Sequence, residues 1–251
     1  MSGKRIVIIG AGLGGVCAGI KFKEAGHENI TILEKNPKVG GTWYDNTYPG
    51  CACDVQVALY QYSFAQSVNW TRLYPSSQEI QAYIEEIVER HQLGPHLQLS
   101  TPAKSAEWRQ DTQDWLVTTE AGDEITADIV VGALGQLNRP NWPNMDGLDS
   151  FAGPKMHSAR WDHSVDLAGK KIGVIGAAAS AIQLIPQIAK TAGKVTVFQR
   201  TPNWVIPRMD RAITLEEKML MMTDPELAVR LGETNRQLIW EQADKYFWQA
   251  F

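Results

Sequence analysis

The clearest hydrophobic pattern in the chain is an unbroken run of β-branched residues near its start. The run KRIVIIG, residues 4–10, predicts a buried parallel strand, because such strands are apolar on both faces. A glycine-rich turn follows, and then a helical pattern to about Lys23 that Gly26 closes. A second apolar run, NITILEK, predicts another buried strand that ends in Glu34. Strand, turn, helix and strand together predict a βαβ unit.

The same order of elements recurs in the second half of the chain. Residues 170–204 read as a strand, a turn, an apolar helix and a second strand, which ends at Arg200 and Thr201. Two βαβ units in one chain predict an α/β fold with two Rossmann-like dinucleotide-binding units.

Between the two units, the pattern changes to an alternation of apolar and polar residues. The stretch has turns at 111–114 and 121–123, and it predicts an antiparallel β-meander. The meander leads into a buried strand at 128–133. This order resembles the one by which flavoproteins with two dinucleotide sites close their FAD domain.

Two helices have sequence signals at their starts. Ser76 and Glu79 match a capping box, and the helix after them has one apolar face, formed by Ile80, Ile84, Ile87 and Val88. Thr214 and Glu217 match a second capping box, which opens a helical insert. A further helix is predicted from Asp224-Pro225, with an apolar stripe of Leu227, Leu231 and Leu238.

The glycine turn of the first unit has the spacing G-x-G-x-x-G. Gly10 permits a tight turn, Gly12 lets the backbone approach a pyrophosphate, and Gly15 lets the helix pack close to the strand. The helix N-terminus offers N–H groups and the positive end of a dipole to phosphates. Glu34 lies where a carboxylate accepts hydrogen bonds from a ribose diol. The first unit is therefore predicted to bind a dinucleotide.

The turn of the second unit departs from this spacing. It consists of Gly176, Ala177, Ala178, Ala179, Ser180 and Ala181, with alanine at the second and third glycine positions. A methyl group at Ala178 crowds a pyrophosphate, so that either binding is weaker or the loop is shifted. At the position where the first unit has Glu34, the second unit has Arg200 and Thr201. A cation and a hydroxyl there suit a 2′-phosphate and therefore favour NADP as the ligand. The alternative is that Arg200 is a solvated residue at a strand end.

The bulk composition limits the classes of function. The 251 residues carry a net charge of −4 with both signs interspersed, which argues against binding to nucleic acid or to a membrane surface. Five glycines between Gly10 and Gly19 argue against a signal peptide, and no apolar stretch is long enough to span a bilayer. We therefore expect a soluble, cytoplasmic protein.

The three cysteines also favour a reducing compartment. Cys51 and Cys53 are too close in sequence for an ordinary disulfide, and Cys17 is left over. No second Cys or His pair lies at zinc-site spacing, so no metal site is expected.

One stretch without a helix or strand pattern, FAGPKMHSARWD, joins the two units. Its spacing F-x-G-x-x-x-H-x-x-x-W followed by Asp resembles the fingerprint of the Baeyer–Villiger monooxygenases, which are class B flavoprotein monooxygenases. The positions are filled by Phe151, Gly153, His157, Trp161 and Asp162. Three further segments resemble the family: GGTWYDNTYPGCACD at 40–54, GALGQLNRP at 132–140 and VFQRTPNW at 197–204.

The resemblance implies an activity and two cofactors. In that family, NADPH reduces FAD, and the reduced flavin activates O2 to convert a ketone to an ester or a lactone. Asp54 would lie beside the flavin and nicotinamide, and His157 would couple domain movement to catalysis. The matching FAD contacts are Glu34, Thr42, Trp43, Asp45, Asp54, Tyr60 and Gln136. The matching NADP contacts are Gly176, Ala177, Ala178, Ala179, Ser180, Ala181, Gln183, Arg200 and Thr201.

Each of these residues also has a structural interpretation. Trp43 and Tyr60 are also consistent with aromatic residues of the core, and Asp54 with a loop cap. A histidine such as His157, taken alone, is more often structural than catalytic.

The resemblance further implies that this chain corresponds to the N-terminal half of the family's proteins, which are roughly twice as long, a size typical of several domains. The expected parts are an FAD-binding domain at 1–140, a linker with the fingerprint at 141–168, the first part of an NADP-binding domain at 169–209 and a helical insert at 210–251. The family's active-site arginine, which stabilises negative charge on the activated oxygen, has no match here.

Three functions remain open at this point. The first is Baeyer–Villiger oxidation, and the second is N- or S-oxygenation by a related flavin monooxygenase. The third is a catalytically inactive subunit that needs a C-terminal partner chain. We expect the isolated chain to self-associate or to require that partner, because the apolar stripe and an open sheet edge call for more protein.

Overall fold

The computed structural model describes residues 3–205, 207–224, 226–227, 229–230, 233–234 and 237. The chain divides into two compact units that are interleaved in sequence. The first unit comprises Met1–Thr47 and Ile80–Trp161, and the second comprises Tyr48–Glu79 and Asp162–Phe251. The four-part division expected from the sequence stays a prediction.

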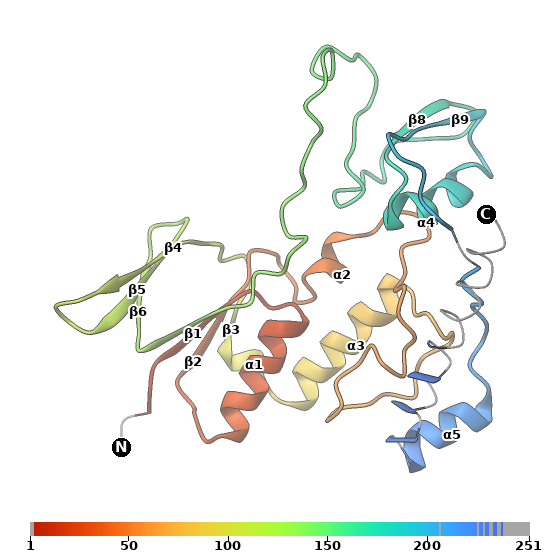
Figure 1. The fold of residues 1–251 in the computed structure, drawn as a ribbon. Coiled ribbons are helices and arrows are strands. Elements are labelled where there is room, and N and C mark those ends of the chain that lie inside the picture. Colours follow the sequence, from red (N-terminus) through yellow and green to blue (C-terminus); the bar gives the residue numbers. More distant parts are fainter. Residues whose placement is uncertain are drawn as a thin grey trace. The chain divides into compact units, whose positions relative to one another are not determined.

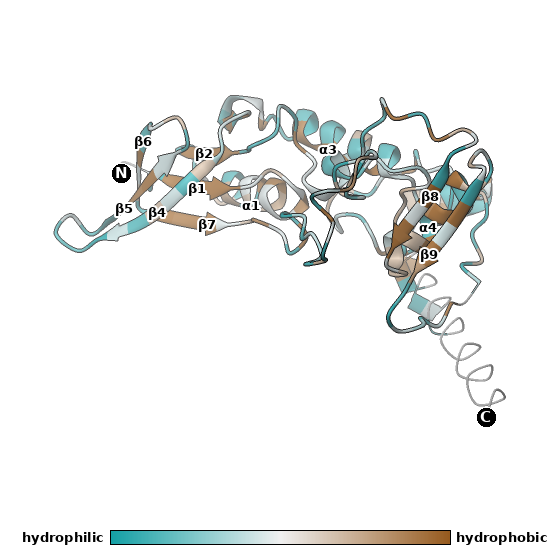
Figure 2. Ribbon diagram, turned by 90° about the horizontal axis from the view of Figure 1, so that it is seen from above, coloured by the Kyte–Doolittle hydropathy of each residue, from teal (hydrophilic) through white to brown (hydrophobic). Residues whose placement is uncertain are grey.

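The first unit contains the predicted βαβ arrangement. Its sheet has the order β3-β2-β1-β7, and all its strand pairs are parallel. The strands are β1 (Ile6–Ile9), β2 (Ile30–Leu33), β3 (Leu97–Gln98) and β7 (Ile129–Gly132). Helix α1 (Leu13–Glu24) connects β1 to β2 (Figure 1). The central strand β1 is apolar along its length in Figure 2, as its pattern predicted.

The predicted antiparallel meander is confirmed. It consists of β4 (Ala103–Arg109), β5 (Asp114–Thr119) and β6 (Glu124–Ala127), in the order β4-β5-β6. Val117 and Ala127 of the meander form one buried cluster with Val7 and Leu33 of the parallel sheet. Apolar burial therefore holds the meander against the sheet.

Helix α3 (Ser77–Arg90) starts at the predicted capping box. The Glu79 N–H donates to Ser76 Oγ over 3.2 Å, and the Ser76 N–H donates to Glu79 Oε2 over 3.0 Å. Ile80, Ile84 and Ile87 are fully buried, as predicted for the apolar face, whereas Val88, the fourth predicted member, is half-buried. A 3-10 helix, η1 (Gly94–His96), then leads into β3.

The second unit contains the repeated arrangement. Strands β8 (Lys171–Ile175) and β9 (Lys194–Phe198) pair in parallel, and α4 (Ala179–Ile188) joins them. Helix α5 (Leu215–Thr223) begins at the predicted capping box of Thr214 and Glu217. The predicted fold class, α/β with two Rossmann-like units, a meander and a helical insert, is confirmed.

The last predicted helix is only partly covered. The Leu227 N–H donates to Asp224 Oδ1 over 2.9 Å, as expected of a capping aspartate. Pro225, Leu231 and Leu238 lie outside the described residues, so the predicted apolar stripe stays a prediction. Among the helices that the structure describes, none is both long and apolar enough to cross a bilayer.

Candidate functional site

The glycine turn after β1 is closed so tightly that two of its glycines have no room for a side chain. Gly10 has a φ of +105°, and a Cβ there would lie 2.5 Å from the carbonyl oxygen of Ala133. A Cβ on Gly15 would lie 1.7 Å from the carbonyl oxygen of Gly10. Gly12 is the N-cap of α1, and no side chain caps that helix end. The turn therefore presents backbone at a helix N-terminus, which suits a pyrophosphate.

Glu34 braces this turn from the end of β2. Its side chain is buried, with 4% of its surface exposed. Oε2 accepts a hydrogen bond from the Ala11 N–H over 2.7 Å, and Oε1 accepts one from the Asn36 N–H over 2.9 Å. A carboxylate oxygen has a second lone pair, so both oxygens keep acceptor capacity for ribose hydroxyls.

The loop with the GGTW sequence lies directly against the glycine turn. A Cβ on Gly12 would lie 3.5 Å from Gly41 Cα, and Gly41 itself has a φ of +57°. Short helix α2 (Thr42–Asp45) follows Gly41. The structure thus brings Thr42, Trp43 and Asp45 into the neighbourhood of the turn, as a shared dinucleotide site requires.

Asp45 is at the centre of a cluster of cations. Its carboxylate lies 3.4 Å from Lys35 Nζ and 3.4 Å from Arg160 Nη1, and it accepts a hydrogen bond from Asn36 Nδ2. Only 10% of the Asp45 side chain is exposed. The role of Asp45 in FAD binding stays a prediction. The observed contact with Arg160 shows that Asp45 also holds the fingerprint segment to α2.

The fingerprint residues form a local structure with clear steric reasons. A Cβ on Gly153 would lie 2.6 Å from the Phe151 ring, so that a side chain at Gly153 would force the ring to move. His157 Nδ1 accepts a hydrogen bond from the Ala159 N–H over 3.1 Å, and the His157 ring meets the Trp142 ring edge to face.

This environment favours the neutral form of His157. Partial burial, together with the nearby Arg160 guanidinium, lowers the pKa of His157 below its ordinary value. Because Nδ1 accepts a hydrogen bond, the imidazole carries its proton on Nε2. Gln136, the other predicted site residue of this stretch, is exposed.

The second glycine turn has the same backbone conformation as the first, despite its alanines. Gly176 has the φ of Gly10, +105°. Ala178 has φ −78° and ψ −174°, close to the −75° and −171° of Gly12. The sequence left open whether this loop is shifted, and at these two positions the backbone is not shifted. An extended conformation suits alanine as well as glycine.

Replacing Ala178 by glycine therefore tests the methyl group alone. We expect Ala178→Gly to tighten NADPH binding about tenfold, because it removes a methyl group from the surface that a pyrophosphate approaches. Glycine is at least as good an N-cap as alanine, so α4 is not weakened. Fluorescence titration with NADPH measures the change. An unaltered Kd would show that the pyrophosphate lies away from the methyl.

The other members of this turn occupy different environments. Ala181 is buried, so α4 leaves space for a methyl group where α1 has none at Gly15. Ala177 accepts a hydrogen bond through its carbonyl from Asn203 Nδ2, which ties the segment after β9 to the turn. Ala179 is exposed, and Ser180 is half-buried.

Arg200 and Thr201 are both exposed where β9 ends. Within the part of the chain that the structure describes, Arg200 forms neither an ion pair nor a side-chain hydrogen bond. An exposed guanidinium with no partner among the described residues is suited to a phosphate.

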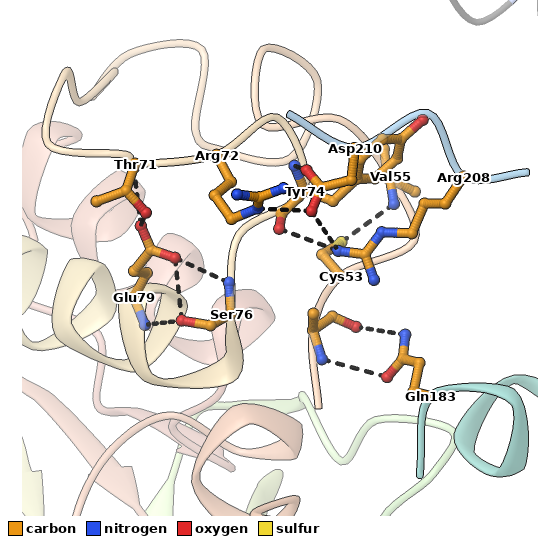
Figure 3. A network of polar contacts seen from close by, with 11 residues as sticks. Cys53, Val55, Thr71, Arg72, Tyr74, Ser76, Glu79, Gln183, Arg208 and Asp210 are labelled. Atoms are coloured by element: carbon orange, nitrogen blue, oxygen red, sulfur yellow. Dashed lines mark hydrogen bonds and ion pairs between the residues drawn. The ribbon is translucent and has the colours of Figure 1, made fainter. Parts of the chain in front are cut away.

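Gln183, on α4, is engaged with the protein rather than open to solvent. Its amide forms two hydrogen bonds with the backbone of Ala52, as the dashed lines in Figure 3 show. Asp54, two residues further on, is exposed, and Tyr60 is half-buried. Sequence reasoning missed the contact between Gln183 and Ala52. Gly50, in the same loop, was the one residue in the sequence that could have indicated a close approach of this loop to α4.

The cysteines of this loop are free thiols. Cys51 and Cys53 are buried. Burial raises the pKa of both thiols, that of Cys53 to about 12, so both remain protonated at neutral pH. Among the residues that the structure describes, no group of His, Cys, Asp or Glu could hold a metal ion.

Comparison with known proteins agrees with this geometry. Residues 7–220 match the family model described as pyridine nucleotide-disulphide oxidoreductase. A Baeyer–Villiger monooxygenase of Streptomyces coelicolor is 42% identical over 236 residues, which cover 94% of this chain and 44% of that protein.

Solved structures show the same relationship. Cyclohexanone monooxygenase from Rhodococcus sp. Phi1, bound to NADP+, superimposes with a TM-score of 0.83 at 36% identity, over 88% of this chain and 42% of that one. The OTEMO complex with FAD and NADP has a TM-score of 0.83 at 31% identity, over 88% and 43% of the two chains.

The chain thus spans less than half the length of these relatives. The resemblance that the fingerprint indicated is confirmed. The chain belongs to the pyridine nucleotide-disulphide oxidoreductase family, and its curated relatives include Baeyer–Villiger monooxygenases.

Proposed function

We propose that this chain supplies the two dinucleotide-binding units of a flavin-dependent monooxygenase of the Baeyer–Villiger type. The enzyme would use NADPH and O2 to oxidise ketones to esters or lactones. The observation that carries the proposal is the pair of turns at Gly10 and Gly176, which share one backbone conformation at the start of a helix. When bound, FAD supplies the activation of oxygen and NADPH supplies the hydride.

The first turn fits FAD. Gly10 and Gly15 form a cradle that a Cβ would fill, and α1 begins there without a side-chain cap. Glu34 is placed to accept hydrogen bonds from the ribose. A carboxylate repels a 2′-phosphate, so this turn favours FAD over NADP. The other proposed contacts with FAD are Thr42, Trp43, Asp45, Asp54, Tyr60 and Gln136.

The second turn fits NADP. Residues Gly176 to Ala181 form the cradle, and α4 also begins without a side-chain cap. Arg200 and Thr201 supply a cation and a hydroxyl for the 2′-phosphate. Asp54 and His157 are the proposed catalytic residues. The surroundings of His157 lower its pKa and so favour its neutral form, which fits an indirect role.

We do not propose that this chain reduces disulphides, although the family's name includes that activity. A dithiol that reduces disulphides needs a reactive thiolate in an accessible site. Cys51 and Cys53 are buried, and burial raises the pKa of both thiols. The three free cysteines also support the proposal of a cytoplasmic location.

The preference for NADPH tests the proposal. We expect the protein to bind NADPH more tightly than NADH, and Arg200→Ala to weaken NADPH roughly 10- to 100-fold while NADH is unaffected, because a charge-assisted hydrogen bond to phosphate is lost. Titration of the flavin-loaded protein with both cofactors measures this. Lys194→Ala, at the other end of β9, removes the same charge as a control. Equal binding of NADH and NADPH by the unmodified protein would refute the assignment.

We also propose that the second unit is completed by further polypeptide, from a C-terminal partner chain or through self-association. Within the described residues, β8 and β9 form a two-stranded sheet. Ile175 is 54% exposed and Phe198 is 58% exposed, an unusual state for parallel strands.

Two measurements test this completion. We expect light scattering to show that the isolated chain is oligomeric, and we expect no ketone oxidation without a C-terminal half. A monomer that converts a ketone to an ester unaided would contradict both expectations.

A further inference from the structure

The loop with Asp54 is attached to the helix that starts at the second glycine turn. The Ala52 N–H donates to Gln183 Oε1 over 3.2 Å, and Gln183 Nε2 donates to the Ala52 carbonyl oxygen over 2.9 Å. The Gln183 side chain thus satisfies both the N–H and the carbonyl group of Ala52, as a neighbouring strand would, although the two residues are 131 positions apart in the sequence (Figure 3).

Two more contacts join this loop to α4. The Tyr48 hydroxyl donates to Gln183 Oε1 over 2.9 Å. Burial raises the pKa of Tyr48 to about 12, so the phenol keeps the proton that it donates. Gly50 has a φ of +82°, and a Cβ there would lie 2.8 Å from the carbonyl oxygen of Gln183. The loop backbone therefore lies directly on the helix.

The other side of the same loop is also held. The Cys53 N–H donates to the Pro75 carbonyl over 2.9 Å, and the Val57 N–H donates to the Leu73 carbonyl over 2.7 Å. Tyr74, between these two acceptors, is held by the Arg208 guanidinium, which lies 4.9 Å from the centre of its ring and donates to its carbonyl oxygen. Figure 3 shows Arg208 and Asp210 around Tyr74.

We propose that Gln183 is a positioning residue for Asp54. The inference rests on the proposed function, in which Asp54 is catalytic and the second turn binds NADP. Asp54 itself is exposed, so its place depends on the backbone of its neighbours. Gln183 holds that backbone and lies in the first turns of α4. Binding of a dinucleotide to the start of α4 is thereby linked to the carboxylate of Asp54.

The hydrogen bonds of Gln183 favour this role over direct contact with NADP. An amide oxygen has two lone pairs, and Gln183 Oε1 already accepts from Tyr48 and from Ala52. One of the two Nε2 hydrogens is given to Ala52. The oxygen has no capacity left for a ligand.

Hydrogen exchange of the ligand-free full chain tests the inference directly. We expect Gln183→Met, which keeps the length of the side chain and removes its hydrogen bonds, to speed exchange of the Ala52 amide about tenfold. Gln187→Met, one turn further along α4, is the matched control and should leave that amide unchanged. Equal exchange in wild type and Gln183→Met overturns the proposal.

A kinetic measurement separates positioning from binding. In flavin-loaded protein without oxygen, we expect Gln183→Met to slow flavin reduction at saturating NADPH about tenfold, with the Kd for NADPH within twofold of wild type. A weaker Kd with an unchanged rate at saturation would make Gln183 an NADP contact and overturn the proposal. If NADPH does not reduce the flavin of the wild type, the proposed function fails, and the exchange of Ala52 still decides the role of Gln183.

Discussion

Gly15→Ala is expected to be the most damaging single-methyl change in the first dinucleotide unit. The new Cβ would lie 1.7 Å from the carbonyl oxygen of Gly10, a backbone atom that a side-chain rotation cannot move away. Helix α1 must then separate from β1, at a cost of ~3 kcal/mol or more in the free energy of unfolding. The turn opens at the same time, so retention of FAD should be lost. Chemical denaturation and the absorbance of bound flavin measure the two effects.

The neighbouring glycine provides a matched control. A Cβ on Gly14 would meet only Ala133 Cβ, at 3.9 Å, which is an ordinary contact. Gly14→Ala lies in the same first turn of α1 and raises helix propensity, so stability should be equal or higher by about 0.5 kcal/mol. Comparable losses in both variants would contradict this expectation, because they would show that the close approach of α1 to β1 at Gly15 does not control this site.

Glu34→Ala is expected to weaken both the fold and the binding of flavin. The Ala11 N–H is fully buried, and the Glu34 carboxylate is its hydrogen-bond acceptor. A buried donor without a partner costs about 1–3 kcal/mol, and the ribose hydroxyls of FAD lose a partner of similar value. Thermal unfolding of the flavin-free protein measures the first effect, and flavin titration of the folded protein measures the second.

Glu28→Ala serves as the control for charge. Glu28 is exposed and precedes the same strand, so its removal changes the net charge equally without touching the turn. Stability and flavin affinity should both stay within about 0.5 kcal/mol of wild type. If Glu34→Ala destabilises the protein but binds flavin normally, Glu34 braces the turn and does not contact the ribose.

The two glycine turns show why the alanine at position 178, in place of the usual glycine, was difficult to interpret from the sequence. The sequence indicated that Ala178 crowds a ligand, and it left open a shift of the loop. The observed φ and ψ of Ala178 match those of Gly12. Backbone conformation at a turn depends on the strand and helix on either side, which a spacing rule does not describe. We therefore expect the methyl group of Ala178 to affect the binding of a ligand and not the backbone of the turn.

Much of the fold was accessible from local patterns. Apolar runs predicted β1, β2, β8 and β9, alternation predicted the meander, and both capping boxes formed where Ser76 and Thr214 predicted them. These signals are local, because the period of a strand or helix and the bonds of its cap involve residues within one or two turns. The relation to the Baeyer–Villiger monooxygenases also followed from residues at fixed spacing.

The order of the elements, the two glycine turns and the relation to the family could all be predicted from the sequence alone. Only the tertiary structure showed that Gln183 holds Ala52, that Asp45 pairs with Lys35 and Arg160, and that Glu34 bonds the turn that it follows. These contacts join residues that are up to 131 positions apart. Such a pair leaves no periodic pattern in the sequence, and each of its residues is equally consistent with a solvated surface position. The two groups stabilise each other only after folding has brought them together and removed them from water.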